Sequence, residues 1–266
     1  MGKTEETDLL LRDVERYVRG LLNEELPAAY LFNNLDRTLE RVYQGGRFAD
    51  ALALSEEERE VLLLALWFRG AGFTRDGEAP LAASADIAAE WLSQCQVDPD
   101  IIERVGALIR RSAPERQPET RLDKVMHDVV WSFLGQKSFF GLSNLLRLER
   151  ESLEGRSYTS HEWQQRMRDR LVNSNYYTEY GRSEFLNRKV KNIAKQRKNL
   201  IKAEQNRIRR QTGKDFGRGV DTVYRVAFRN HINLSRIADG KANMIITINT
   251  AVLSAGITIG TLTMTS

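Results

Sequence analysis

The sequence has few of the residues that stabilise secreted proteins. Its 266 residues include a single cysteine, Cys95, so no disulfide can form within the chain, which fits a reducing compartment. Residues 1–13 are polar and rich in acids, so we predict no N-terminal signal sequence. Five prolines and a hydrophobic fraction of 41% exclude a fibrous or wholly disordered chain. The length allows one sizeable core or two small ones.

Acidic side chains are scarce in the last part of the chain. Residues 188–266 carry 16 basic and 4 acidic side chains, whereas residues 1–187 carry 24 and 32. The overall charge of +4 therefore hides an acidic first part and a strongly basic second part. Such asymmetry predicts an anionic partner for the second part, either a membrane surface or a nucleic acid.

Charge is absent altogether after Lys241. Residues 242–266 form an uncharged stretch that is long enough to cross a bilayer as a helix, although it is rich in Thr, Gly and Asn. We predict a transmembrane helix here, with a second span beyond residue 266; a buried core helix or a β-rich tail is the alternative. The positive-inside rule then predicts that residues 1–241 lie in the cytoplasm.

Helical periodicity runs through nearly the whole chain, and no segment has the pattern of a strand. Ser55 and Glu58 have the spacing of a capping box ahead of the apolar run 61–68, and Gly45-Gly46 is expected to end the preceding helix. We predict an all-α fold with a helical domain, a basic connector helix and the transmembrane helix.

The basic connector is expected over residues 188–220. Residues 188–210 contain ten basic side chains and one acid, Glu204, among helix-forming residues, and three glycines follow in a hinge at 211–222. The helix is either a solvated connector or a surface that contacts anionic lipid headgroups. Nucleic acid is the weaker alternative, because no aromatic residues alternate with the basic ones, and we predict no nucleic-acid partner.

Four segments resemble the HD-domain metal-dependent phosphohydrolases, in the same order. They are Phe32–Glu40, Leu66–Phe73, Ser84–Ala88 and Asp128–Gly135. The resemblance implies a helical HD-like domain over residues 1–187. The positions that match the family's metal ligands read Arg37, Arg69, Gly70 and Asp128. A protonated guanidinium cannot donate a lone pair to a metal, so we predict no bound metal or other cofactor and no enzymatic activity.

If that fold is retained, Arg37, Arg69 and Asp128 converge, and two hypotheses stay open. In the first, Asp128 pairs with one or both arginines as a structural bridge. In the second, the arginines bind a phosphorylated ligand without cleaving it, with Arg110 and Arg111 adding positive charge.

The C-terminal part resembles the transmembrane effectors of Pycsar antiphage defence. An Arg-Asn-His-x-x-Leu-Ser motif and an Ala-Asp-x-Lys-Ala-Asn motif carry the resemblance within domain 221–266, although Gly240 departs from the polar residue common there. The membrane-entry residues are Arg229, Asn230, His231, Ser235, Asp239, Lys241, Asn243 and Asn249. Polar groups near a span need partners, which predicts a homo-oligomer, with a monomeric anchor as the alternative.

The two resemblances together imply a membrane effector of antiphage defence. It would respond to a cyclic pyrimidine mononucleotide and disrupt the inner membrane, with the inactive HD-like domain as sensor or oligomerisation module. The alternatives are a membrane-anchored scaffold whose HD-like domain binds a protein partner and, less favoured, an active nucleotide phosphohydrolase.

Overall fold

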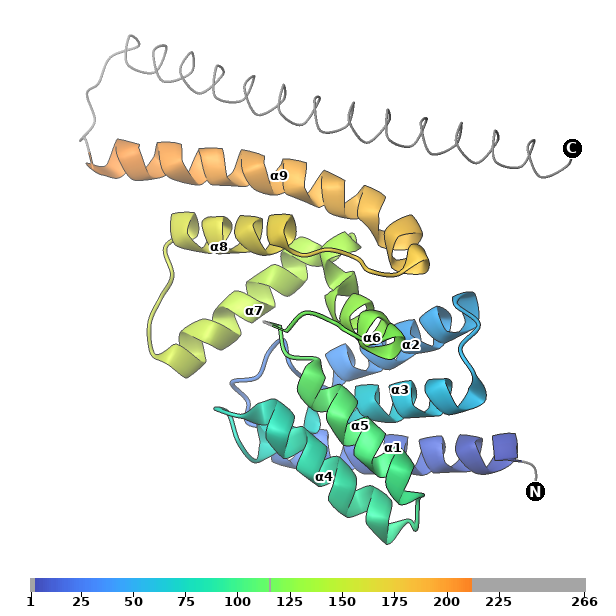
Figure 1. Ribbon diagram of the computed structural model, residues 1–266. Coiled ribbons are helices and arrows are strands. Elements are labelled where there is room, and N and C mark those ends of the chain that lie inside the picture. The colour runs from blue at the N-terminus through green and yellow to red at the C-terminus, as the bar shows by residue number, and fades with distance from the viewer. Residues whose placement is uncertain (1–2, 115, 212–266) are drawn as a thin grey trace, which may run out of the picture. The chain divides into compact units, whose positions relative to one another are not determined.

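The computed structural model describes residues 3–114 and 116–211, and this part of the chain is entirely helical (Figure 1). The chain divides into two units, residues 1–204 and 205–266. The α-helices are α1 Lys3–Glu25, α2 Leu35–Ala51, α3 Glu56–Phe68, α4 Pro80–Gln94, α5 Pro99–Arg111, α6 Arg121–Trp131, α7 Phe139–Glu154, α8 Ser160–Asn173 and α9 Glu179–Gln211. Two short 3₁₀ helices, η1 Ala71–Thr74 and η2 Ser132–Gly135, follow α3 and α6.

The centre of the core is α3, whose residues from Val61 to Phe68 are all apolar. Every residue from Glu60 to Phe68 is buried, and α1, α2 and α5 pack around this helix. A helix without a polar face is stable only when it is enclosed by others. The predicted capping box is present, because Ser55 and Glu58 each accept a hydrogen bond from the other's backbone N–H.

The prediction that Gly45-Gly46 ends a helix is wrong, because α2 continues through both glycines to Ala51. A Cβ atom at Gly45 would lie 2.2 Å from Leu66 Cδ1 on α3. The missing side chain therefore allows α2 and α3 to approach closely, and the packing gained compensates for the poor helix propensity of glycine.

The helix α9 contains the predicted basic segment 188–210. It packs on the preceding helices of the first unit through three buried polar side chains, which we call the polar seam. Lys189, Asn192 and Gln196 are buried on this side of the helix. Asn192 Nδ2 donates to Leu134 O and Gln136 O at 2.8 and 2.9 Å, and Gln196 Nε2 donates to Gln164 O at 2.8 Å. Side chains thus satisfy backbone carbonyls at the ends of the neighbouring elements.

The all-α part of the fold prediction is confirmed for the described residues, but the transmembrane helix in that prediction is wrong. No helix within residues 3–114 and 116–211 is sufficiently long and apolar to cross a membrane. The longest of them, α9, carries the ten basic side chains of segment 188–210, and charges at this density oppose insertion into hydrocarbon. Residues 242–266, on which the prediction rested, lie outside the described residues, as does the hinge at 212–222.

Candidate functional site

A cavity of about 630 Å³ lies among the helices of the first unit, at the place where the two N-terminal segments with an HD-like pattern meet. Its lining combines five arginines with an aromatic group and two glutamates. The charged residues are Arg41, Arg69, Arg110, Arg150, Arg170, Glu78 and Glu149, and the aromatic residues are Tyr30, Phe32, Phe73, Trp131 and Phe133.

Arg41, on α2, is the most buried arginine of the lining. Its residue is 3% exposed, and its one described hydrogen bond runs from Nη2 to Asn33 Oδ1 at 3.3 Å. The Nε atom is buried without a hydrogen-bond partner in the described structure. Burial lowers the pKa of Arg41 well below its ordinary value, and the positive charges of Arg37 and Arg69 lower it further, while the carboxylates of Glu40 and Glu149 act in the opposite direction. The guanidinium is thus held in a position that disfavours its charge.

Arg69 occupies the C-terminal end of α3 and faces the same cavity. Its Nε donates to Ser112 Oγ at 2.9 Å and its Nη2 to Ser112 O at 3.3 Å, so its described partners are neutral. Burial, followed by the charge of Arg37, lowers the pKa of Arg69 from 12.5 to about 10. The guanidinium therefore stays protonated at neutral pH, and its positive charge reaches the cavity without a carboxylate beside it.

Arg37 lies one turn before Arg41 on α2 but does not line the cavity. It forms an ion pair with Glu40, and its Nη2 donates to Val130 O at 3.1 Å. Its guanidinium carbon is 4.8 Å from the ring centroid of Phe133, at the distance of a cation–π contact. Arg37 is therefore a structural residue that adds positive potential from behind the cavity wall.

Glu149, on α7, is the buried carboxylate of the lining, and neutral N–H groups occupy it. Its Oε2 accepts hydrogen bonds from the backbone N–H groups of Phe32 and Asn33, both at 2.8 Å, and its Oε1 accepts from Asn33 Nδ2 at 2.6 Å. The side chain of Asn33 in turn accepts the hydrogen bond from Arg41. Glu149 thus anchors the segment before α2 and reaches Arg41 through Asn33.

The remaining arginines lie toward solvent. Arg110, at the end of α5, forms an exposed ion pair with Asp86 on α4 at 2.8 Å. Arg150 pairs with Glu154 on the next turn of α7 at 3.3 Å, and the guanidinium of Arg170 lies over the ring of Trp131. Exposed ion pairs exchange partners at small cost, so Arg110 and Arg150 can turn toward an anion that enters the cavity.

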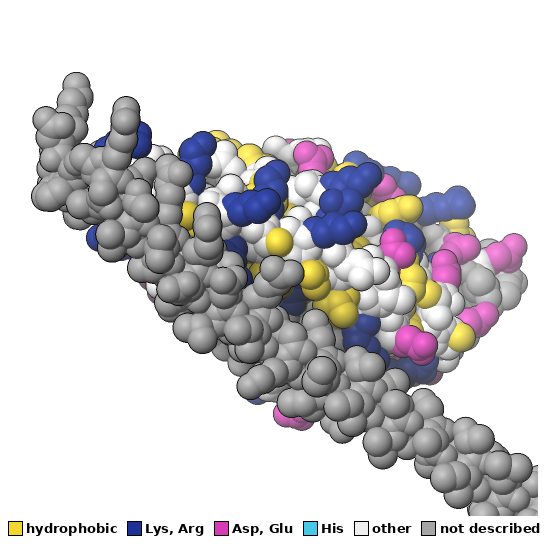
Figure 2. Space-filling view, turned by 90° about the horizontal axis from the view of Figure 1, so that it is seen from above, with side chains coloured by type: hydrophobic (Ala, Val, Ile, Leu, Met, Phe, Trp, Pro, Cys, Tyr) yellow, Lys and Arg dark blue, Asp and Glu magenta, His cyan; other side chains and the backbone are white. Residues whose placement is uncertain are grey.

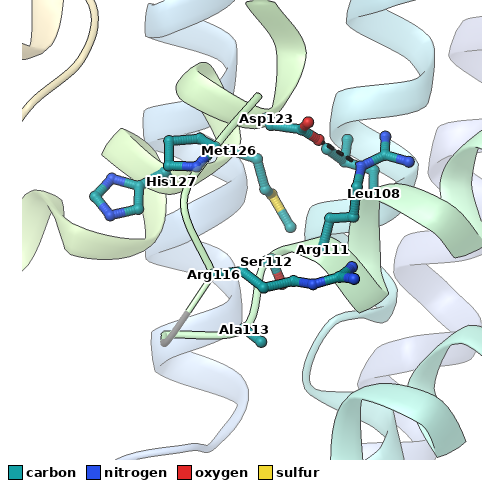
Figure 3. A pocket seen from close by; sticks show the side chains of 9 residues that line it. Leu108, Arg111, Ser112, Ala113, Arg116, Asp123, Met126 and His127 are labelled. Carbon is teal, nitrogen blue, oxygen red and sulfur yellow. Dashed lines mark hydrogen bonds and ion pairs between the residues drawn. The ribbon is translucent and has the colours of Figure 1, made fainter. Parts of the chain in front are cut away.

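Arg111, which sequence reasoning grouped with Arg110, faces a different place. Figure 3 shows it in a small pocket between α5 and α6, where its Nε bonds to Asp123 Oδ1 at 2.8 Å. This ion pair and the hydrogen bond from the backbone N–H of Thr120 keep the pKa of Asp123 below its ordinary value, although burial alone would raise it. Arg111 therefore joins two helices and does not contribute to the cavity.

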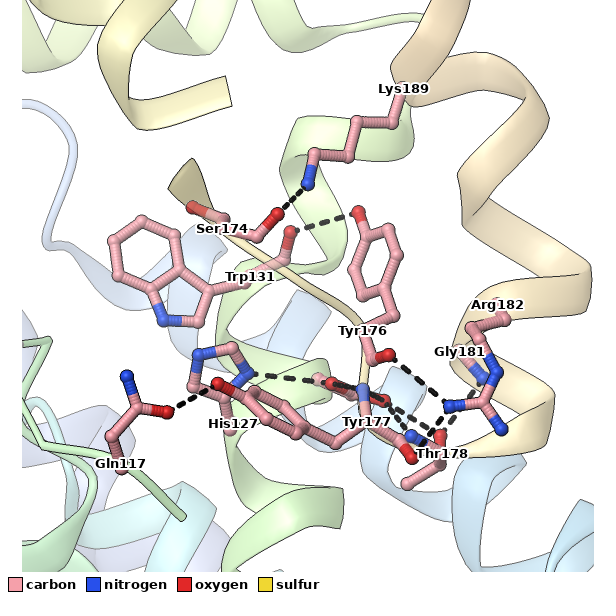
Figure 4. Close-up of polar contacts among 11 residues, drawn as sticks. Gln117, His127, Trp131, Ser174, Tyr176, Tyr177, Thr178, Gly181, Arg182 and Lys189 are labelled. Atoms are coloured by element: carbon pink, nitrogen blue, oxygen red, sulfur yellow. Dashed lines mark hydrogen bonds and ion pairs between the residues drawn. The ribbon is translucent and has the colours of Figure 1, made fainter. Parts of the chain in front are cut away.

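Asp128 has partners that sequence reasoning did not foresee. Its carboxylate accepts hydrogen bonds from the backbone N–H groups of Tyr177 and Thr178 and from Thr178 Oγ1, at 2.7 to 3.1 Å, and His127 Nδ1 lies 3.4 Å away. Figure 4 shows His127, Tyr177 and Thr178 close to one another. Asp128 thus fixes the first turn of α9. The hypothesis that it pairs with an arginine is wrong, because no ion pair in the described part of the chain joins the two.

The other predicted features fall outside this geometry. Within residues 3–114 and 116–211, no three His, Cys, Asp or Glu side chains gather in a group that could hold a metal ion. The eight membrane-entry residues lie outside the described residues: Arg229, Asn230, His231, Ser235, Asp239, Lys241, Asn243 and Asn249.

Sequence reasoning identified Arg69 and Arg110 but missed Arg41, which is the most deeply placed of the cavity arginines. The spacing from Arg37 to Arg41 is four residues, which puts both on one helix face and could have indicated it. Glu149, Arg150 and Arg170 come from α7 and α8, far along the chain, and carry no local pattern that would place them beside α2.

Comparison of the chain with protein-family models, with curated proteins and with solved structures found no match. Both resemblances therefore remain predictions.

Proposed function

We propose that the helical body of this protein is a binding module that holds a phosphorylated small molecule in the arginine-lined cavity. The observation that carries the proposal is the pair Arg41 and Arg69. Both side chains are buried at the cavity, and neither forms an ion pair with a carboxylate in the described structure. An uncompensated buried charge is costly, and an anionic ligand would offset that cost.

The chemistry of the lining favours phosphate over a simple carboxylate. Guanidinium groups bind phosphate oxygens through paired N–H donors, and arginines from several elements can surround one tetrahedral group. The volume of about 630 Å³ lies in the range of small-molecule sites. Tyr30 and Phe73, with ring centroids 4.9 Å apart, give the cavity an aromatic wall on which a planar group can stack. A nucleotide combines these two chemistries.

The lining also supports binding without turnover. Hydrolysis of a phosphate ester needs a group that activates water, commonly a metal ion held by histidines and carboxylates. The positions from which HD phosphohydrolases hold their metal read Arg37, Arg69, Gly70 and Asp128, and the Asp128 carboxylate is occupied by the start of α9. We therefore propose that the protein is a sensor that binds its ligand without hydrolysing it.

The resemblance of residues 221–249 to Pycsar effectors suggests which nucleotides to test first, namely cyclic CMP and cyclic UMP. The role in antiphage defence stays a prediction, and the proposed ligand binding does not require it. A transmembrane helix has no part in the proposal.

Isothermal titration calorimetry on the full chain tests the proposal with cyclic CMP, cyclic UMP, cyclic AMP, UMP and inorganic phosphate. We expect saturable binding of at least one nucleotide, and a loss of at least tenfold in affinity in Arg69→Met, since a charge-assisted hydrogen bond contributes roughly 1.5–3 kcal/mol. Arg59→Met, which removes an exposed arginine paired with Asp50, is the matched control and should bind normally.

The scaffold alternative predicts a different result. If no nucleotide or phosphate produces heat while the protein is folded, as shown by its tryptophan fluorescence, the cavity is not a phosphate site. Equal affinity in the wild type and in Arg69→Met would also count against the proposal.

A further inference from the structure

The outward face of α9 carries two strips of side chains of different chemistry. Leu186, Val190 and Ala194 are exposed and follow one another at intervals of four residues, so they share a line along the helix. Val190 is 55% exposed and Leu186 is 43% exposed, which is unusual for apolar residues in the middle of a long surface helix. These side chains are exposed, whereas Lys189, Asn192 and Gln196 of the polar seam are buried.

The second strip is basic and runs beside the first. Lys191, Lys195, Lys198 and Lys202 are exposed and separated by four, three and four residues, which aligns them along the helix. Figure 2 looks down on this side of the molecule and shows Lys and Arg side chains gathered there, with hydrophobic side chains between them.

The basic strip is not neutralised by acidic side chains in the described structure. Lys191, Lys198 and Lys202 take part in no ion pair among residues 3–114 and 116–211, and Lys195 lies over the ring of Phe140. Of the three described acids of this helix, Glu179 lies in the first turn, before the lysines begin, and Glu184 and Glu204 pair with Arg47 and His161 on other elements. The face thus presents a row of lysines to its surroundings.

We propose that this face of α9 docks on an anionic lipid surface as a peripheral, interfacial helix. Basic residues beside an apolar strip on one helix suit the headgroup region, where lysines meet lipid phosphates and short apolar side chains enter the acyl boundary. Single-stranded nucleic acid would bind the lysines too, but such surfaces add aromatic side chains for base stacking, and the two strips contain none. The docking uses neither the cavity nor any span across the bilayer.

Co-sedimentation of the full chain with vesicles tests the proposal. The probes are vesicles of phosphatidylcholine with and without phosphatidylglycerol, and the measured quantity is the ratio of the two partition constants. The test variant replaces Lys191, Lys198 and Lys202 by Gln. The control replaces three exposed basic residues elsewhere, Arg12, Arg116 and Lys137, by Gln, so both variants lose the same charge.

We expect the test variant to lose on the order of 100-fold in the partition ratio, at about one kcal/mol per surface-bound lysine, and the control to stay within severalfold of the wild type. A second variant, Leu186→Ser with Val190→Ser, should weaken vesicle binding and leave tryptophan fluorescence unchanged, because both side chains are already exposed.

Two results would overturn the proposal. One is an equal partition ratio in the wild type, the test variant and the control, which would make the lysines a solvated face. The other is tight binding of single-stranded oligouridine that the lysine substitutions abolish and the apolar substitutions leave intact, which would make the face a nucleic-acid surface.

Discussion

Replacing Arg41 by methionine should make the free protein more stable and, at the same time, unable to bind its ligand. Methionine has a similar length and no charge. Arg41 is buried, has a single described hydrogen bond at 3.3 Å, and lies in the field of two further arginines, Arg37 and Arg69. Each of these features disfavours the charged guanidinium in the folded protein, so a role in stabilising the fold does not explain them.

The expected gain in stability is the cost of burying the positive charge of Arg41 minus the contribution of its hydrogen bond. For the neighbouring Arg69, a pKa of about 10 instead of 12.5 corresponds to roughly 3 kcal/mol against the charged form, at about 1.4 kcal/mol per pK unit. The pKa of Arg41 is lowered in the same direction, and its long hydrogen bond contributes only about 1 kcal/mol. We therefore expect Arg41→Met to stabilise the ligand-free fold by about 2 kcal/mol, or about 4–8 °C in Tm for a body of this size.

Urea and thermal unfolding followed by tryptophan fluorescence are the assay, because the four tryptophans, Trp67, Trp91, Trp131 and Trp163, all lie in the first unit. With nucleotide at about a hundred times its Kd, the wild type should gain about 2.7 kcal/mol and the variant nothing. The exposed substitution Arg59→Met is the control and should change stability by less than about 0.5 kcal/mol. A loss of stability above about 2 kcal/mol in Arg41→Met would refute the reasoning, since it would make the guanidinium a structural partner.

Three further predictions concern groups outside the cavity. Asp128→Asn should destabilise the fold by about 2–3 kcal/mol in urea unfolding, because only one of the two oxygens that accept hydrogen bonds from Tyr177 and Thr178 remains and the amide N–H₂ faces an N–H donor; a change below about 0.5 kcal/mol would contradict this. Burial lowers the pKa of Lys189 from 10.5 to about 8, although Asp128 acts to raise it. The unfolded chain therefore binds the lysine proton more strongly between these values, and stability should rise with pH by about 1–2 kcal/mol from pH 8 to 9.5 in the wild type relative to Lys189→Met. If the free energy of unfolding depends on pH in the same way in the wild type and in Lys189→Met, the lowered pKa of Lys189 is refuted. Finally, metal analysis of the purified protein should find no stoichiometric Fe, Mn or Zn, and EDTA should leave Tm unchanged; a chelator-induced loss of stability would show a metal site that we do not expect.

Local signals predicted the helices well, because caps and apolar periodicity act over a few residues. The capping box at Ser55 and the proline at the start of α5 define helix ends through contacts within one turn. The prediction that Gly45 ends a helix was wrong because this glycine makes room for Leu66, a residue on another helix. Propensity cannot reveal such a tertiary contact.

The candidate site was predictable only in part. Arg69 was found through a motif pattern and Arg110 through its positive charge at the end of a predicted helix. Glu149 and Arg170 reach the cavity from helices that follow more than a hundred residues after α2 begins. Asp128 misled the prediction because its partners, the backbone N–H groups before α9, are present in every sequence and form no side-chain pattern. Charge pairing alone could not foresee that backbone donors would satisfy this carboxylate.

The most direct test of the proposed function is the position of a bound anion. Crystals of the full chain soaked in tungstate, a tetrahedral dianion like phosphate, allow the metal to be located by anomalous scattering. We predict a strong peak inside the cavity, within hydrogen-bonding distance of the guanidinium groups of Arg41 and Arg69. Peaks confined to the surface lysines of α9, with none in the cavity, would contradict the proposal.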